Sequence, residues 1–122
     1  MFKRKILSKL EAWKRDERHK PLILRGARQV GKTTVVNEFG SQFDNYLYFN
    51  LEMNESVRLF EMDIPLNDLV NMLFASLGKS QREGSTLIFI DEIQNSPKTI
   101  ALLRYFYEQR PDLYVIAAGS LL

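Results

Sequence analysis

The fold of this chain is decided by the stretch Gly26-Ala27-Arg28-Gln29-Val30-Gly31-Lys32-Thr33-Thr34. A short apolar run at 22–24 precedes it, and a helix-like run at 32–39 follows it, with Gly40 as the expected stop. A strand, a glycine-rich loop and a helix in this order are the context of a phosphate-binding loop. Glycines let the backbone turn tightly and approach a ligand. Successive N–H groups and the helix N-terminus attract phosphate.

All the residues of this loop are candidate phosphate-binding residues. We expect Lys32 to reach the β- and γ-phosphates of a nucleotide and the Thr33 hydroxyl to hold Mg²⁺. Arg28 has two open interpretations, because it could fold over the phosphates or contact a partner chain. The alternative for the whole stretch is a tight turn that binds nothing. Four positions match the phosphate-loop pattern between a strand and a helix, which argues against this alternative; they are Gly26, Gly31, Lys32 and Thr33.

Composition limits the other kinds of chemistry. The chain has 122 residues, 45% of them hydrophobic and 26% charged, which is ordinary for one globular domain. Cysteine is absent, which excludes disulfides and thiolate chemistry, and His19 is the single histidine. No apolar run approaches the ~20 residues of a membrane span, and the N-terminus does not resemble a secretory signal. A cytoplasmic location is therefore expected, without membrane association.

The N-terminal segment is basic. Residues 1–20 hold eight Lys and Arg residues against three acidic residues, although the whole chain has a net charge of only +2. Residues 2–19 are predicted to be a helix whose apolar face includes Leu10 and Trp13. Its basic face could contact nucleic acid or an acidic partner. The favoured interpretation is a solvated face, with Trp13 anchoring the apolar face on the domain.

Strands and helices are predicted to alternate along the rest of the chain. Beyond the loop we expect strands at 46–51, 86–91 and 113–118, and helices at 54–60, 66–77 and 97–109. This alternation predicts an α/β fold with a parallel sheet and right-handed crossovers. Ligands of such sheets bind at the carboxyl ends of the strands. The glycine loop, Asp91-Glu92 and Ser120 all fall at such ends.

Asp91 and Glu92 follow four apolar residues, a pattern known as Walker B. Asp91 can hold Mg²⁺ opposite Thr33, and Glu92 can polarise a water for attack on the γ-phosphorus. The alternative is an Asp that caps a turn beside a surface Glu. Ser120 could contact the γ-phosphate or the attacking water, but Gly-Ser is also ordinary turn chemistry, so both remain open. Gln94 could orient water, although a solvated residue is favoured.

With these motifs in view, the chain resembles the P-loop ATPases of the AAA/STAND-like division, and in particular the prokaryotic AAA-type ATPases. The resemblance rests on the loop at 26–34, on Asp-Glu-Ile-Gln at 91–94, on residues 20–26 and on Ala-Gly-Ser at 118–120. It implies a three-layer P-loop NTPase fold with a parallel sheet of order 5-1-4-3-2 and strands at 22–25, 46–51, 86–91 and 113–118. It also implies Thr33 and Asp91 on Mg²⁺, Glu92 as catalytic base and Ser120 as sensor 1.

Members of that family are longer than this chain. The expected organisation is therefore an N-terminal amphipathic helix at 1–20 packed on an ATPase core at 21–122, which ends before the fifth strand and the helical lid. Without that strand the first strand would be a sheet edge open to association. An arginine finger or second sensor would come from elsewhere.

The predicted function is an ATP-binding, Mg²⁺-dependent ATPase module of a longer protein, with Lys32, Glu92 and Ser120 as catalytic residues. Its cofactors would be ATP and Mg²⁺, and its partners a second copy of itself or another protein. The alternatives are a nucleotide switch without hydrolysis, a partner-binding or nucleic-acid-binding module, and a small-molecule kinase. The Asp91-Glu92 pair and the lack of an acceptor pocket argue against the kinase.

Overall fold

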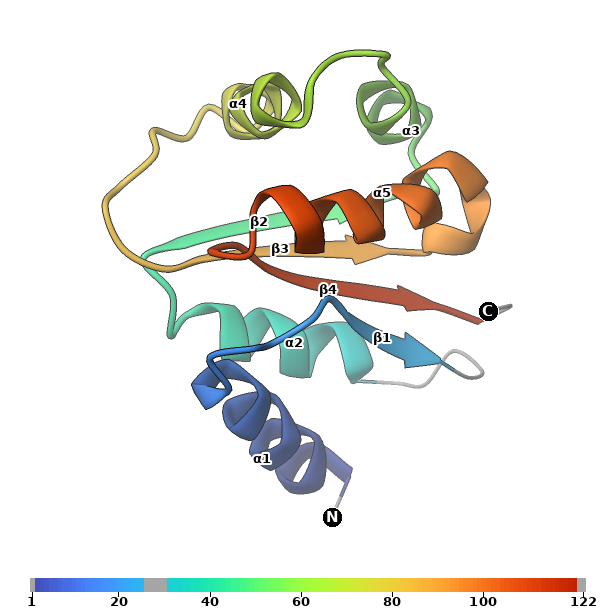
Figure 1. The fold of residues 1–122 in the computed structure, drawn as a ribbon. Helices are drawn as coiled ribbons and strands as arrows, with labels where there is room; N and C mark the ends of the chain where they lie inside the picture. The colour runs from blue at the N-terminus through green and yellow to red at the C-terminus, as the bar shows by residue number, and fades with distance from the viewer. Residues whose placement is uncertain (1, 26–30, 121–122) are drawn as a thin grey trace.

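The computed structural model describes residues 2–25 and 31–120. In chain order its elements are α1 (Phe2–Arg15), β1 (Leu22–Arg25), α2 (Lys32–Gly40), β2 (Asn45–Asn50), α3 (Asn54–Phe60), α4 (Leu66–Ser76), β3 (Thr86–Asp91), the 3₁₀ turn η1 (Ile93–Asn95), α5 (Pro97–Gln109) and β4 (Tyr114–Gly119). The strands are all parallel and lie in the order β1-β4-β3-β2. This arrangement confirms the α/β fold and the expected order of the first four strands (Figure 1).

Strand β3 lies inside the sheet between two hydrophobic layers. Its residues alternate between them: Ile88 and Ile90 pack with α3, α4 and α5, whereas Leu87 and Phe89 pack with α1 and α2. All four side chains are fully buried. A parallel strand that is covered on both faces needs apolar residues at every position, which is why its sequence shows a continuous hydrophobic run.

Helix α1 is shorter than predicted. It ends at Arg15 and not at residue 19, because Asp16 turns the chain: its carboxylate accepts a hydrogen bond from the Arg18 N–H at 2.9 Å and its carbonyl one from the His19 N–H at 3.1 Å. Short polar side chains such as Asp compete with the helix for backbone donors in this way.

Aromatic and polar contacts attach this segment to the sheet. The Trp13 indole donates to the Lys20 carbonyl at 2.7 Å, and the Tyr114 hydroxyl donates to the Lys14 carbonyl at 3.0 Å. The His19 ring stacks on Tyr114 with centroids 3.9 Å apart. Trp13 is thus a packing anchor, as the sequence suggested.

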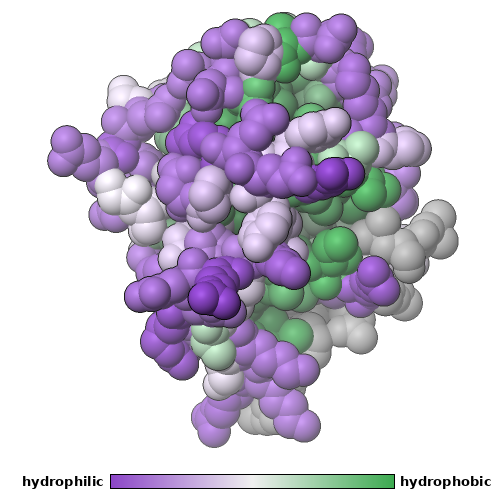
Figure 2. Space-filling model, in the orientation of Figure 1, coloured by the Kyte–Doolittle hydropathy of each residue, from purple (hydrophilic) through white to green (hydrophobic). Residues whose placement is uncertain are grey.

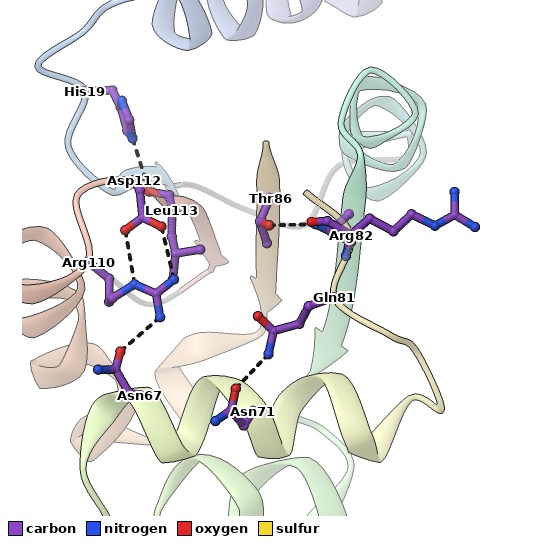
Figure 3. A network of polar contacts seen from close by, with 10 residues as sticks. His19, Asn67, Asn71, Gln81, Arg82, Thr86, Arg110, Asp112 and Leu113 are labelled. Atoms are coloured by element: carbon purple, nitrogen blue, oxygen red, sulfur yellow. Dashed lines mark hydrogen bonds and ion pairs between the residues drawn. The ribbon is translucent and has the colours of Figure 1, made fainter. Parts of the chain in front are cut away.

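A polar network surrounds the turn between α5 and β4 (Figure 3). Arg110, after α5, binds both carboxylate oxygens of Asp112 at 3.1 and 3.0 Å and reaches Asn67 of α4 at 2.9 Å. The guanidinium hydrogen bonds lower the pKa of the Asp112 carboxyl. The network ties α4 to the turn before β4, and His19 contacts the Leu113 carbonyl beside it at 3.1 Å.

Strand β1 pairs only with β4 within the described residues, so it forms one edge of the sheet there. Its Ile23 side chain is 37% exposed, and hydrophobic atoms are visible over this part of the sheet (Figure 2). None of the described helices is both long enough and apolar enough to cross a membrane.

Gly40 is the last residue of α2 and not the stop after it. A Cβ at this position would lie 2.6 Å from the Tyr46 ring, so the glycine makes room for β2 to pack against the helix.

We predict that Gly40→Ala lowers the free energy of unfolding by about 1–3 kcal/mol because of this clash. Helix propensity alone would favour alanine by about 1 kcal/mol, so the sign separates the two effects. Urea denaturation measures it. Gly78→Ala is the control, because a Cβ there meets no atom within 4 Å and only its φ of +65° is strained. A more stable Gly40→Ala protein would contradict the packing argument.

Candidate functional site

The start of helix α2 lies at the carboxyl edge of the sheet. Gly31 precedes the helix with a φ of +93°, a left-handed conformation that glycine adopts without the steric cost of a Cβ. Its carbonyl accepts the first helical hydrogen bond, from the Val35 N–H at 2.8 Å. Lys32 and Thr33 are therefore the first two residues of the helix, where the backbone N–H groups have no partner within the helix and can bind an anion. The candidates Gly26, Ala27, Arg28, Gln29 and Val30 lie outside the described residues.

Thr33 and Asp91 meet although they are far apart in the sequence. The Thr33 hydroxyl donates a hydrogen bond to Asp91 Oδ2 at 2.9 Å. Thr33 is held by the helix start, and Asp91 is the last residue of the buried strand β3. The backbone N–H of Glu92 donates to the other oxygen, Oδ1, at 3.0 Å. The carboxylate is thus fixed in place beside the hydroxyl.

Tyr48 is a third side chain at this point, and sequence reasoning missed it. Its hydroxyl donates to Asp91 Oδ2 at 3.2 Å from the neighbouring strand β2. Burial, followed by the nearby charge of Asp91, raises the pKa of Tyr48 to about 12. The sequence around Tyr48 gives no sign of a contact with Asp91, because only the pairing register between β2 and β3 brings the tyrosine to the site.

Glu92 leaves the strand in an unusual backbone conformation. Its φ of +54° is the only positive value among the described residues other than glycine. Such a conformation costs roughly 1–3 kcal/mol for a side chain of this kind and is found disproportionately at functional sites.

Gln94 differs from the favoured expectation of a solvated residue. Its Nε2 donates to Glu92 Oε1 at 2.9 Å, and its Oε1 is buried without a hydrogen-bond partner among the described residues. Gln94 belongs to the turn η1, which the sequence did not predict. The side chain thus helps to fix the Glu92 carboxylate.

The remaining candidates surround this group more loosely. Lys32 is half-buried at the helix start, and Thr34, two positions later, is exposed. Ser120 is exposed directly after β4, the strand that lies beside β3. All of them lie at the carboxyl edge of the sheet.

The donor set fits a small divalent cation. Mg²⁺ prefers oxygen ligands, keeps several waters and is usually held by one or two protein groups together with substrate phosphates. One hydroxyl and one carboxylate, Thr33 and Asp91, provide that number. The described residues contain no group of three or more His, Cys, Asp or Glu side chains that could enclose a metal by themselves.

Comparisons with known proteins agree with the fold. A family model described as an AAA domain matches residues 18–122. In fold, the chain is similar to the Orc1 protein of Aeropyrum pernix, solved in complex with DNA, with a TM-score of 0.60 and 18% identity. It is also similar to PCH-2 of C. elegans, with a TM-score of 0.57 and 14% identity. These matches cover 98% of this chain but 38% of each of those chains. No curated protein matches the sequence.

Proposed function

We propose that this chain, which belongs to the AAA domain family, is an ATP-binding module that hydrolyses ATP with Mg²⁺ in the intact protein. The observation that carries the proposal is the 2.9 Å hydrogen bond between Thr33 and Asp91. It joins a helix N-terminus suited to phosphate with a carboxylate suited to Mg²⁺. The family, the positive φ of Gly31 and the position of the site at the carboxyl edge of the sheet support it further.

The residues have separable roles in this proposal. Thr33 and Asp91 would hold Mg²⁺, which neutralises charge on the β- and γ-phosphates when it is bound. Lys32 and the loop amides would stabilise the charge that develops on the transferred phosphoryl group. Glu92 would orient and polarise the attacking water, and Ser120 would contact the γ-phosphate from the next strand.

We predict that Lys32→Ala weakens ATP binding by about 10- to 100-fold, because one charge-assisted contact contributes roughly 1.5–3 kcal/mol. Calorimetric titration with ATP and Mg²⁺ measures the effect. Lys9→Ala is the control, because Lys9 is exposed on α1. Unchanged affinity of the Lys32→Ala protein would contradict the assignment of this lysine.

We predict that Glu92→Gln leaves ATP affinity within about twofold of the wild type but lowers turnover of the intact protein by about 10²- to 10⁴-fold, the usual contribution of a general base. Phosphate release measures turnover. Glutamine has nearly the same size as glutamate. Glu55→Gln is the control for the loss of one negative charge, because Glu55 is exposed on α3. Normal turnover would refute the role of Glu92. Binding without phosphate release by the wild-type intact protein would support the nucleotide switch instead.

A second candidate function is contact with nucleic acid, and the structure of α1 favours it. The apolar side of the helix packs on α2, and its opposite side carries four exposed cations, Arg4, Lys5, Lys9 and Arg15. The small residues Ser8 and Ala12 lie between them by helical spacing. The acidic Glu11 accepts a hydrogen bond from Gln42 at 3.0 Å. The four cations outnumber this one carboxylate, so the outward side is net cationic and accessible to a phosphate backbone.

An anionic membrane is a less suitable partner for the same helix. Membrane-surface helices insert an apolar face, whereas Leu10 and Trp13 of α1 already pack on the domain. The Orc1 protein, which is similar in fold, was solved in complex with DNA, and a nucleic-acid contact by this chain would be consistent with that likeness.

We predict that the chain binds duplex DNA at low salt and that changing the four α1 cations to glutamine abolishes binding. Four phosphate contacts give a slope of about −3 to −4 for log K against log salt concentration. Fluorescence anisotropy measures both. The control changes four exposed cations elsewhere to glutamine, namely Lys79, Arg82, Lys98 and Arg104. No binding at low salt, or equal loss in both variants, would reject this surface.

A further inference from the structure

We propose that Tyr48 is a positioning residue for Asp91, and that its hydroxyl holds this carboxylate in the orientation required for Mg²⁺. The inference rests on the proposed ATP site and extends it to a side chain outside the glycine loop and the Asp-Glu pair. Tyr48 would touch neither nucleotide nor metal, and it would act only through Asp91.

The sheet register places Tyr48 for this task. Tyr48 pairs with Phe89, two residues before Asp91, and its ring packs on the Phe89 ring with centroids 5.3 Å apart. Side chains two residues apart lie on the same face of a strand. The hydroxyl therefore reaches along β3 to Asp91 Oδ2, at 3.2 Å.

A second tyrosine on the same face makes a useful contrast. Tyr46 lies two residues before Tyr48, but its hydroxyl donates to Asn37 of α2 and not to Asp91. Burial raises the pKa of Tyr46 as well. The two tyrosines thus share strand, face and chemistry, but they hold different partners: the helix and the carboxylate.

The hydrogen bonds on Asp91 show what Tyr48 contributes. Oδ2 accepts from both Thr33 and Tyr48, and Oδ1 accepts from the Glu92 N–H. A carboxylate oxygen offers about two acceptor positions. Oδ2 is therefore filled by the two hydroxyls, and the capacity that remains is on Oδ1. Without Tyr48, one position on Oδ2 is released and the carboxylate is less firmly oriented.

The size of the expected effect follows from the position of Tyr48 behind a proposed metal ligand. Groups that orient a metal ligand in this way typically change metal affinity by about 10- to 100-fold when removed.

The test is a Mg²⁺ titration of nucleotide binding by the intact protein, followed with a fluorescent ATP analogue. We expect Tyr48→Phe to raise the Mg²⁺ concentration at half-saturation about tenfold. Affinity for the analogue in EDTA should stay within about twofold, because the ring still packs on Phe89 and no phosphate contact is lost. A merely structural role would change both quantities together.

Tyr46→Phe is the matched control, since it removes one hydroxyl from the same strand and face. It should leave the Mg²⁺ half-saturation unchanged. Equal half-saturation for Tyr48→Phe and the wild type, or an equal shift in both variants, would overturn the role of Tyr48 while leaving the ATP site intact. If the wild-type protein binds no nucleotide, the proposed function itself fails and this role fails with it.

Discussion

The hydrogen bond between Thr33 and Asp91 depends on two features that the rest of the structure maintains. Strand β3 is buried on both faces, so its end cannot shift without disturbing both hydrophobic layers. Helix α2 starts at the same edge of the sheet and packs on one of those layers through Val35, Val36 and Phe39. Packing thereby holds the Thr33 hydroxyl and the Asp91 carboxylate 2.9 Å apart. The residues next to either one in the sequence do not set this distance.

Local conformations at the site are costly, and the surrounding structure stabilises them. Gly31 enters α2 in a left-handed conformation that only glycine adopts easily. Glu92 adopts one with a full side chain, and its N–H and carboxylate are both engaged, by Asp91 and Gln94. These bonds offset part of the strain. Glu92 thus keeps a full side chain in a conformation that glycine adopts more easily.

Prediction from sequence succeeded where one local signal was sufficient. The strand at 86–91 and the helix at 97–109 have short-range causes, and the structure agrees with both predictions. It failed where a distant or competing contact decides. The hydrogen bonds of Asp16 end α1 before residue 19. The Tyr46 ring leaves no room for a Cβ at Gly40, which therefore lies inside the helix and not after it. The Oε1 atom of Gln94 is buried in the turn η1, which the sequence did not predict.

The sequence by itself determined the order of elements and the parallel sheet, because hydrophobic periodicity is a local property of the chain. Only the tertiary structure decided which side chains share the site. Tyr48 reaches Asp91 through strand register, and Gln94 reaches Glu92 through a turn. Register and turn geometry arise from the packing of the whole sheet, so no stretch of residues near Asp91 encodes them.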